Sequence, residues 1–121
     1  FILDIEENIG INADRNYIIQ LIDNLVINTI SYCKKGLITI TLNQDRNHVR
    51  LSFSDEGIGI PKEELYEVFE PFTVSSRTRT PAGGRGVGLA VCKRILEVHG
   101  GTIKAESDGK KGATFTVILP V

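Results

Sequence analysis

The sequence lacks most of the features that mark secreted, membrane-spanning or nucleic-acid-binding proteins. Its two cysteines, Cys33 and Cys92, form no disulfide framework and no Cys-x-x-Cys pair, so a reduced, cytoplasmic setting is expected. Uninterrupted apolar runs, such as residues 25–27, extend over only a few residues, which excludes a membrane-spanning helix. The formal net charge of −1 argues against nucleic acid as the main partner.

What is present is the composition of one folded domain. Of the 121 residues, 41% are hydrophobic and 24% are charged, and there is no repeat and no linker. We therefore expect a single globular domain over residues 1–121. The first residue is Phe1 and no basic, apolar leader follows it, which indicates a piece of a longer protein.

Hydrophobic spacing predicts a long amphipathic helix in the first third of the chain. Asp14 is a typical N-cap residue, and the helix is expected over 15–34, with Gly36 marking its end. Apolar residues at three- and four-residue spacing predict one buried face, made of Ile18, Leu21, Ile22, Leu25 and Val26.

The remaining pattern predicts an α+β domain. Alternating apolar residues indicate a strand near 2–6, a hairpin over 38–42 and 49–53, and a last hairpin over 102–107 and 113–119. A short helical start is expected at 61–65 and a helix at 86–98. Residues 71–84 show no pattern and have the length of a functional loop. We expect a mostly antiparallel sheet with helices on one face.

A polar stripe on the first predicted helix is the first candidate for chemistry. Gln20, Asn24 and Asn28 follow one another at four-residue spacing, with Ser31 and Tyr32 one turn further, so their side chains lie on one side of the helix. Asn is a mediocre helix former. A solvated helix face would explain the stripe by itself. The alternative is a row of amide oxygens that lines a cleft, where a carbonyl oxygen can ligate Mg²⁺.

Two glycine-containing segments are the other candidates. Residues 55–60, DEGIGI, follow a predicted strand, where a carboxylate can lie at the base of a pocket, although Asp and Gly also form ordinary turns. Residues 83–90, GGRGVGLA, close the long loop and open a helix. Their backbone N–H groups and the helix dipole can hold phosphate, but a flexible hinge explains the glycines equally well.

Together these features match one known pattern. In chain order the segments are Asn24 with Asn28, Asp-x-Gly-x-Gly at 55–59, Phe-Glu-Pro-Phe at 69–72, Gly-x-Gly-x-Gly at 84–88 and Gly-Ala-Thr-Phe at 112–115. They resemble the N, G1, F, G2 and final Gly-Thr boxes of the ATP-binding catalytic domain of bacterial sensor histidine kinases. That family shares a superfamily with gyrase B subunits, ninety-kilodalton heat-shock chaperones and mismatch-repair ATPases. The resemblance implies a Bergerat-type fold, a two-layer α/β sandwich with a mostly antiparallel mixed sheet.

The resemblance also implies roles in binding ATP and Mg²⁺. Asp55 would accept a hydrogen bond from the adenine amine, and Thr114 would support the same site through ordered water. Asn28 would ligate Mg²⁺. Asn24 stands where related hydrolases carry a glutamate base. An amide cannot take a proton from water, which suits a kinase that must preserve ATP for transfer. Asn24 and Asn28 are the candidate catalytic residues. The other candidate ATP contacts are Tyr32, Gly57, Gly59, Ile60, Gly84, Arg85, Gly86, Val87, Gly88 and Leu89.

The long loop corresponds to the family's ATP lid, expected at about 71–84. Its arginines, together with Arg85, can meet phosphate charge. Phe69 and Phe72 are either hydrophobic anchors for the lid or simple core residues.

Three positions depart from the family pattern. Thr29 replaces the usual Ala, Ser31 replaces a basic residue that approaches the phosphates, and Tyr17 replaces an Arg that is often found upstream.

The implied activity is that of a protein-histidine kinase. The domain would bind Mg-ATP and donate the γ-phosphoryl group to a histidine on a separate upstream dimerisation domain, with a response regulator as a further partner. His48 and His99 lack the sequence context of a phosphoacceptor, so the fragment is not expected to be competent alone. The fragment is also expected to be monomeric. Its parent is expected to be homodimeric and can be anchored in the inner membrane. Two alternatives stay open: an anti-sigma-type serine kinase domain, and a degenerate nucleotide-binding module used for docking.

Overall fold

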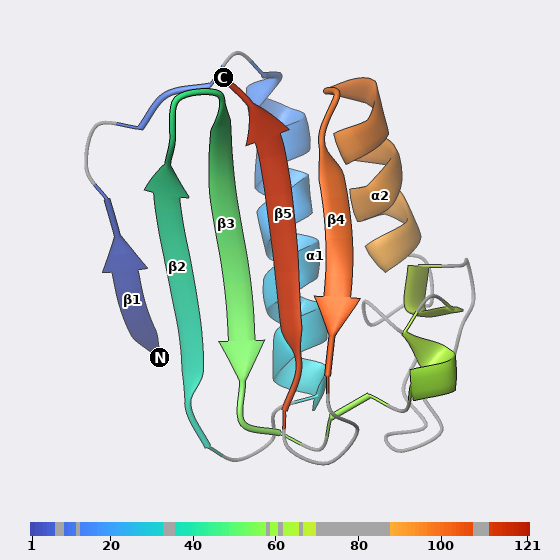
Figure 1. The fold of residues 1–121 in the computed structure, drawn as a ribbon. Coiled ribbons are helices and arrows are strands. Elements are labelled where there is room, and N and C mark those ends of the chain that lie inside the picture. Colours follow the sequence, from blue (N-terminus) through green and yellow to red (C-terminus); the bar gives the residue numbers. More distant parts are fainter. Residues whose placement is uncertain are drawn as a thin grey trace.

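Within the described part of the chain, five strands form one sheet, and two α-helices pack on one of its faces (Figure 1). The computed structural model describes residues 1–6, 9–11, 13–32, 36–57, 59–60, 62–65, 67–69, 88–107 and 112–121. The strands are β1 (Ile2–Ile5), β2 (Ile38–Gln44), β3 (His48–Asp55), β4 (Thr102–Glu106) and β5 (Thr114–Pro120). The helices are α1 (Arg15–Tyr32) and α2 (Gly88–Val98), and two short 3-10 helices are η1 (Lys62–Glu64) and η2 (Glu67–Phe69).

The sheet is mixed, as predicted. Its strand order is β1-β2-β3-β5-β4. β1 runs parallel to β2, and the other three neighbouring pairs are antiparallel. The predicted α+β class, with helices on one face of a mostly antiparallel sheet, is confirmed.

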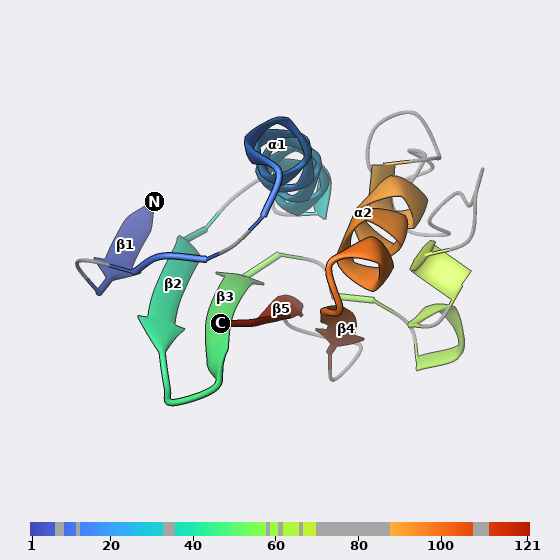
Figure 2. The same cartoon turned by 90° about the horizontal axis from the view of Figure 1, so that it is seen from above.

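The core lies between the sheet and the two helices. Phe53 of β3 and Phe115 of β5 are in register with each other, and both are almost fully buried. Leu25 of α1 and Leu96 of α2 belong to the same buried cluster. α1 packs against β3 and α2 against β4, and both helices lie on the same side of the sheet (Figure 2).

The N-terminus of α1 is capped as the sequence predicts. The backbone N–H groups of Asn16 and Tyr17 donate to Oδ1 of Asp14 over 2.9 and 3.3 Å. These bonds satisfy two of the N–H groups that the first turn of a helix leaves without an intrahelical acceptor.

One residue of the predicted buried face of α1 is wrong. Leu21 and Leu25 are buried, but Ile22 is 38% exposed. The buried face continues instead through Asn28 and Thr29, which are 0% and 1% exposed. A face centred on Leu21, Leu25 and Asn28 turns Ile22 aside, because each residue advances roughly 100° around the helix.

Two further predictions cannot be compared with the structure. The predicted loop at 71–84 and the first two residues of the helix predicted at 86–98 lie outside the described residues.

Candidate functional site

Asp55, the last residue of β3, has its carboxylate held in one orientation. Its Oδ1 accepts hydrogen bonds from the backbone N–H groups of Gly57, at 2.9 Å, and Ala113, at 3.2 Å. The residue is only 7% exposed. Its other oxygen, Oδ2, is buried and has no hydrogen-bond partner among the residues that the structure describes. The protein therefore fixes one carboxylate oxygen and leaves the other for a donor.

The backbone around this carboxylate is closed by a contact that only glycine allows. The N–H of Gly112 donates to the carbonyl of Gly57 over 2.8 Å, and the N–H of Asp55 donates to the carbonyl of Ala113 over 2.9 Å. Gly112 has a φ of +67°, and a Cβ at this position would overlap the Asp55 carbonyl. The close approach brings the N–H of Ala113 within reach of the Asp55 side chain.

Burial sets the electrostatics of this carboxyl group. Burial raises the pKa of Asp55, and the hydrogen bonds from Gly57 and Ala113 partly oppose the shift. A buried carboxylate is costly unless it is paired or hydrogen-bonded on its remaining lone pairs. A ligand that donates to Oδ2 would therefore stabilise the charged form.

Ser107, which the sequence analysis did not single out, supports the same region. Its Oγ accepts a hydrogen bond from the N–H of Ile60 over 2.9 Å and donates to the carbonyl of Gly112 over 2.7 Å. Ile60, a predicted ATP contact, is fully buried in the core, and Gly59 beside it is also buried. Ser107 thus joins the segment after β3 to the segment before β5. No spacing signal marks a lone serine after a strand.

The polar stripe on α1 runs from solvent into the interior. Gln20 is exposed, Asn24 is partly buried, and Asn28 is completely buried. A simple solvated face is therefore wrong for Asn28. Burial raises the pKa of the Cys92 thiol on α2 to about 12, and a hydrogen bond with the Asn24 side chain opposes this shift. Asn24 therefore faces α2.

Thr29, which departs from the family pattern, is accommodated within the helix. Its Oγ1 donates to the carbonyl of Leu25 over 2.8 Å. This bond satisfies the buried hydroxyl group without a partner from another element. The side chains of Ser31 and Tyr32, at the end of the stripe, lie outside what the structure describes.

Two predicted segments lie at the same end of the molecule, the C-terminal end of α1 and the end of β3 at Asp55, and the end of α2 turned toward them is its start, at Gly88 (Figure 1). The C-terminal end of α1, which carries Asn28, and the Asp55 carboxylate therefore lie at the same end of the fold. The predicted contacts at Gly84, Arg85, Gly86 and Val87 lie outside the described residues.

Two further predicted ATP contacts, Thr114 and Leu89, lie within the described residues. The hydroxyl group of Thr114 pairs with Ser54 Oγ at 3.0 Å. Because Phe115 next to it is in the core, strand alternation puts the Thr114 side chain on the sheet face that carries no described helix. It borders an open hollow of about 450 Å³ at the strand ends, and Asp55 lines the same hollow, so the two predicted residues lie at one site. The Leu89 side chain is buried in the core, so only its backbone remains available to a ligand.

Phe69, predicted as a lid anchor or a core residue, is a core residue. It is 9% exposed, and its ring meets the Phe115 ring edge-on, with centroids 6.4 Å apart and an interplanar angle of 86°. Phe72 lies outside the described residues.

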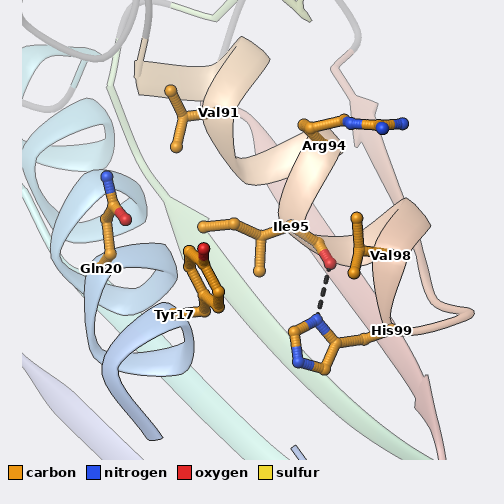
Figure 3. A pocket seen from close by; sticks show the side chains of 7 residues that line it. All are labelled: Tyr17, Gln20, Val91, Arg94, Ile95, Val98 and His99. Atoms are coloured by element: carbon orange, nitrogen blue, oxygen red, sulfur yellow. Dashed lines mark hydrogen bonds between the residues drawn. The ribbon is translucent and has the colours of Figure 1, made fainter. Parts of the chain in front are cut away.

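A second hollow lies between the two helices, toward the start of α1 (Figure 3). Its volume is about 420 Å³, and its lining consists of Tyr17, Gln20, Val91, Arg94, Ile95, Val98 and His99. Both ring nitrogens of His99 are engaged. Nε2 accepts from the backbone N–H of Asp14 at 3.2 Å, and Nδ1 donates to the carbonyl of Ile95 at 2.8 Å. His99 thus links the end of α2 to the start of α1, which supports a structural role.

Comparison with known proteins identifies the family. The family model described as histidine kinase-, DNA gyrase B- and HSP90-like ATPase matches residues 13–121. The chain belongs to this ATPase family. Within it, the resemblance to the ATP-binding catalytic domain of sensor histidine kinases is confirmed by relatives and by solved structures.

Curated relatives of this histidine-kinase-type ATPase domain are much longer proteins. Sensor histidine kinase WalK of Bacillus subtilis (strain 168) is 36% identical over 119 residues, which cover 95% of this chain and 20% of WalK. Adaptive-response sensory kinase SasA of Synechococcus sp. (strain CC9311) is 42% identical over 111 residues, covering 90% of this chain and 29% of SasA. The chain therefore spans less than a third of either relative.

Solved structures share the fold of this ATPase domain. The mycobacterial sensor histidine kinase MprB matches with a TM-score of 0.81 and 27% identity, covering 98% of this chain and 83% of that one. The catalytic domain of histidine kinase ThkA matches with a TM-score of 0.80 and 32% identity, covering 98% of this chain and 80% of that one.

In the part of the chain that the structure describes, neither helix has the length and apolarity needed to cross a membrane.

Proposed function

We propose that this domain, over residues 1–121, binds Mg-ATP and donates the γ-phosphoryl group to a histidine on a separate upstream dimerisation domain of a two-component sensor kinase. The observation that carries this proposal is the Asp55 carboxylate. One of its oxygens is fixed by two backbone N–H groups, and the other is buried without a partner among the described residues. An adenine amine supplies the kind of N–H donor that this second oxygen lacks.

The phosphates would lie toward α1 and the start of α2. Asn28 supplies a buried amide at the end of α1, and Gly88 opens α2, whose N-terminus favours negative charge. Mg²⁺ in nucleotide sites takes few protein ligands beside phosphate oxygens, so a single amide oxygen from Asn28 fits that pattern. When bound, the ion would neutralise phosphate charge. Residues 84–87, and the lid at about 71–84, are proposed to enclose the phosphates.

Transfer would depend on an acceptor that arrives from outside this domain. Asn24 carries an amide, which cannot serve as a base for water. Preserving ATP until a histidine is placed in line with the γ-phosphate is what a kinase requires. The named relatives are sensor kinases, which supports a histidine acceptor over the serine acceptor of the anti-sigma alternative.

The partners follow from the same proposal. The acceptor domain would dimerise the parent, while this fragment would stay monomeric, and a response regulator would receive the phosphoryl group. This domain and the response regulator would act in the cytoplasm, whether or not the parent protein is anchored in a membrane.

A transfer assay with γ-³²P-labelled ATP tests the proposal. This domain is incubated alone and then with the separately expressed histidine-bearing domain of the same protein, and both bands are checked for acid stability. We expect acid-labile label on the added domain and none on this chain. Asp55→Asn should abolish the label, whereas Asp45→Asn, at the opposite end of β3, should retain it.

Other results would point elsewhere. Acid-stable label on a partner would favour the serine kinase alternative. Absence of ATP binding would favour the docking module. Acid-labile label on the isolated domain would show that His48 or His99 is an acceptor.

A further inference from the structure

Ser107, the first residue after β4, uses its hydroxyl group both to accept and to donate a hydrogen bond. Its Oγ accepts from the backbone N–H of Ile60 over 2.9 Å and donates to the carbonyl of Gly112 over 2.7 Å. A serine hydroxyl has a single proton, and the bond to Gly112 uses it. Ser107 therefore cannot donate to a ligand at the same time.

The carbonyl of Gly112 belongs to the same peptide group as the N–H of Ala113. This peptide bond is trans, so its carbonyl and its N–H point in opposite directions within one plane. Ser107 holds the carbonyl, and the N–H donates to Oδ1 of Asp55 over 3.2 Å. One rigid peptide plane thus connects the hydroxyl group of Ser107 to the carboxylate of Asp55.

These groups form one directed chain of hydrogen bonds. It begins at the N–H of Ile60 and passes through the hydroxyl group of Ser107. It continues through the peptide group of residues 112 and 113 and ends at the Asp55 carboxylate. Because the hydroxyl and the peptide each accept one bond and donate the next, they polarise each other and strengthen the last bond. Removing the hydroxyl would free the peptide plane to turn and would take the acceptor away from a buried N–H, that of Ile60.

The strand order explains why a residue after β4 can act on this carboxylate. β3 and β4 flank β5 and both run antiparallel to it, so the ends of β3 and β4 lie beside the start of β5 (Figure 1). Asp55 ends β3, Gly112 lies just before β5, and Ser107 follows β4. Three strands therefore each bring one member of the chain to the same edge of the sheet.

We propose that Ser107 is a positioning residue for adenine recognition, which fixes the Gly112–Ala113 peptide and, through it, the direction in which Oδ2 of Asp55 meets the adenine amine. This inference rests on the proposed function, in which Oδ2 accepts from that amine. Oδ1 keeps a second donor, the N–H of Gly57 at 2.9 Å. Loss of the Ser107 hydroxyl therefore loosens the carboxylate without releasing it, and the expected defect is partial.

Nucleotide discrimination tests the proposal. ATP and purine riboside triphosphate differ only in the exocyclic amine of the base, so the ratio of their affinities measures the bond to Asp55. We expect Ser107→Ala to lower ATP affinity roughly 3- to 10-fold and to leave the affinity for purine riboside triphosphate unchanged. Ser107→Thr keeps the hydroxyl group and should retain most of the ratio, because the open hollow beside residue 107 has room for a methyl group. Ser107→Cys, whose thiol is a weaker donor and acceptor, should show a smaller loss of the same kind.

Gly100→Ala is the control for a merely structural effect. Gly100 lies between α2 and β4, at the other end of β4 from Ser107, and its φ of +74° makes Ala unfavourable there. This variant should be less stable than wild type and should keep both affinities. An unchanged ratio in Ser107→Ala, whether both affinities fall together or neither falls, would overturn the proposal.

Amide exchange measured by NMR follows the same chain of hydrogen bonds without any nucleotide. The N–H of Ala113 should exchange with solvent roughly tenfold faster in Ser107→Ala than in wild type and in Ser107→Thr. The N–H of Val117, in the middle of β5, should change no more than it does in Gly100→Ala. Equal protection of Ala113 in Ser107→Ala and wild type would overturn the proposal.

The two measurements separate this inference from the proposed function. A wild-type domain that does not discriminate between the two nucleotides would refute the adenine assignment and this inference with it. Wild-type discrimination that Ser107→Ala leaves intact would refute this inference alone.

Discussion

Replacing Asp55 by Asn should abolish most nucleotide affinity without unfolding the domain. The structure fixes how the amide must turn. Gly57 and Ala113 present N–H groups to one oxygen, so the Asn oxygen must take that place and keep both bonds. The amide N–H₂ then occupies the position of Oδ2 and presents donors where the carboxylate presented an acceptor. Against an adenine amine, a donor would meet a donor.

The size of the effect follows from the lost bond. A hydrogen bond to a charged group contributes about 1.5–3 kcal/mol, and a buried unpaired donor adds to the loss. Since 1.4 kcal/mol corresponds to a factor of ten, ATP affinity should fall by roughly 10- to 100-fold or more. The two backbone bonds are retained, so the fold should survive.

Calorimetric titration of ATP into both proteins is the appropriate assay, and Asp45→Asn is its matched control. Oδ1 of Asp45 also accepts two backbone N–H bonds, from Asn47 at 2.9 Å and His48 at 2.8 Å, but Asp45 is exposed in the turn between β2 and β3. The control makes the same chemical change in the same local motif, far from the site. We expect it to leave ATP affinity unchanged. An Asp55→Asn protein that folds and binds ATP within a few-fold of wild type would refute the adenine assignment.

Three further predictions concern the metal ligand, the glycine contact and the buried carboxyl. Asn28→Ala should make ATP binding nearly insensitive to Mg²⁺, whereas Asn24→Ala should have a smaller effect on binding. Titration of Mg²⁺ at fixed nucleotide measures both effects. A retained Mg²⁺ dependence in Asn28→Ala would contradict the ligand role. Gly100→Ala should lower the free energy of unfolding, measured with urea, by about 1–2 kcal/mol, because the φ of Gly100 is +74°. Gly112→Ala should cost more and also weaken ATP binding, because its Cβ would overlap the Asp55 carbonyl; equal costs would contradict this. The raised pKa of Asp55 contributes stability below about pH 3.8 that is lost as pH rises through the folded-state pKa. The free energy of unfolding of wild type relative to Asp55→Asn should therefore fall over that window, and a constant difference would contradict the shift.

Much of the fold follows from short-range sequence signals. The Asp14 cap, the alternation in 38–42 and 49–53, and the apolar spacing through Leu21 and Leu25 each predict an element that the structure contains. These signals work because burial and backbone hydrogen bonding act locally, within one turn or one strand. Asp55 was predicted through the family resemblance, since Asp and Gly after a strand are by themselves also ordinary turn residues.

What the sequence could not supply depends on contacts between distant segments. The N–H of Ala113, 58 residues away, donates a hydrogen bond to Asp55 Oδ1, and a backbone donor leaves no mark on residue type. Thr114 was singled out by the family's final Gly-Thr box, which does not reveal that its hydroxyl pairs with Ser54. Ile22 fitted the apolar spacing of α1 but is 38% exposed, beside the buried face that runs through Leu21 and Leu25. In each case the side chain's identity was informative and its direction was not.

The candidate site is set by strand register, which ties binding to folding. The pairing of Phe53 with Phe115 in the core fixes the register of β3 against β5. Two residues beyond Phe53, the same register places Asp55 opposite Ala113, just before β5. Gly112 then lets the two backbones touch, and the N–H of Ala113 fixes one carboxylate oxygen. A slip of one residue between these strands would turn Phe115 out of the core and remove that N–H from Asp55 together. The large cost of exposing Phe115 therefore protects the orientation of the carboxylate, which by itself is worth only a hydrogen bond or two.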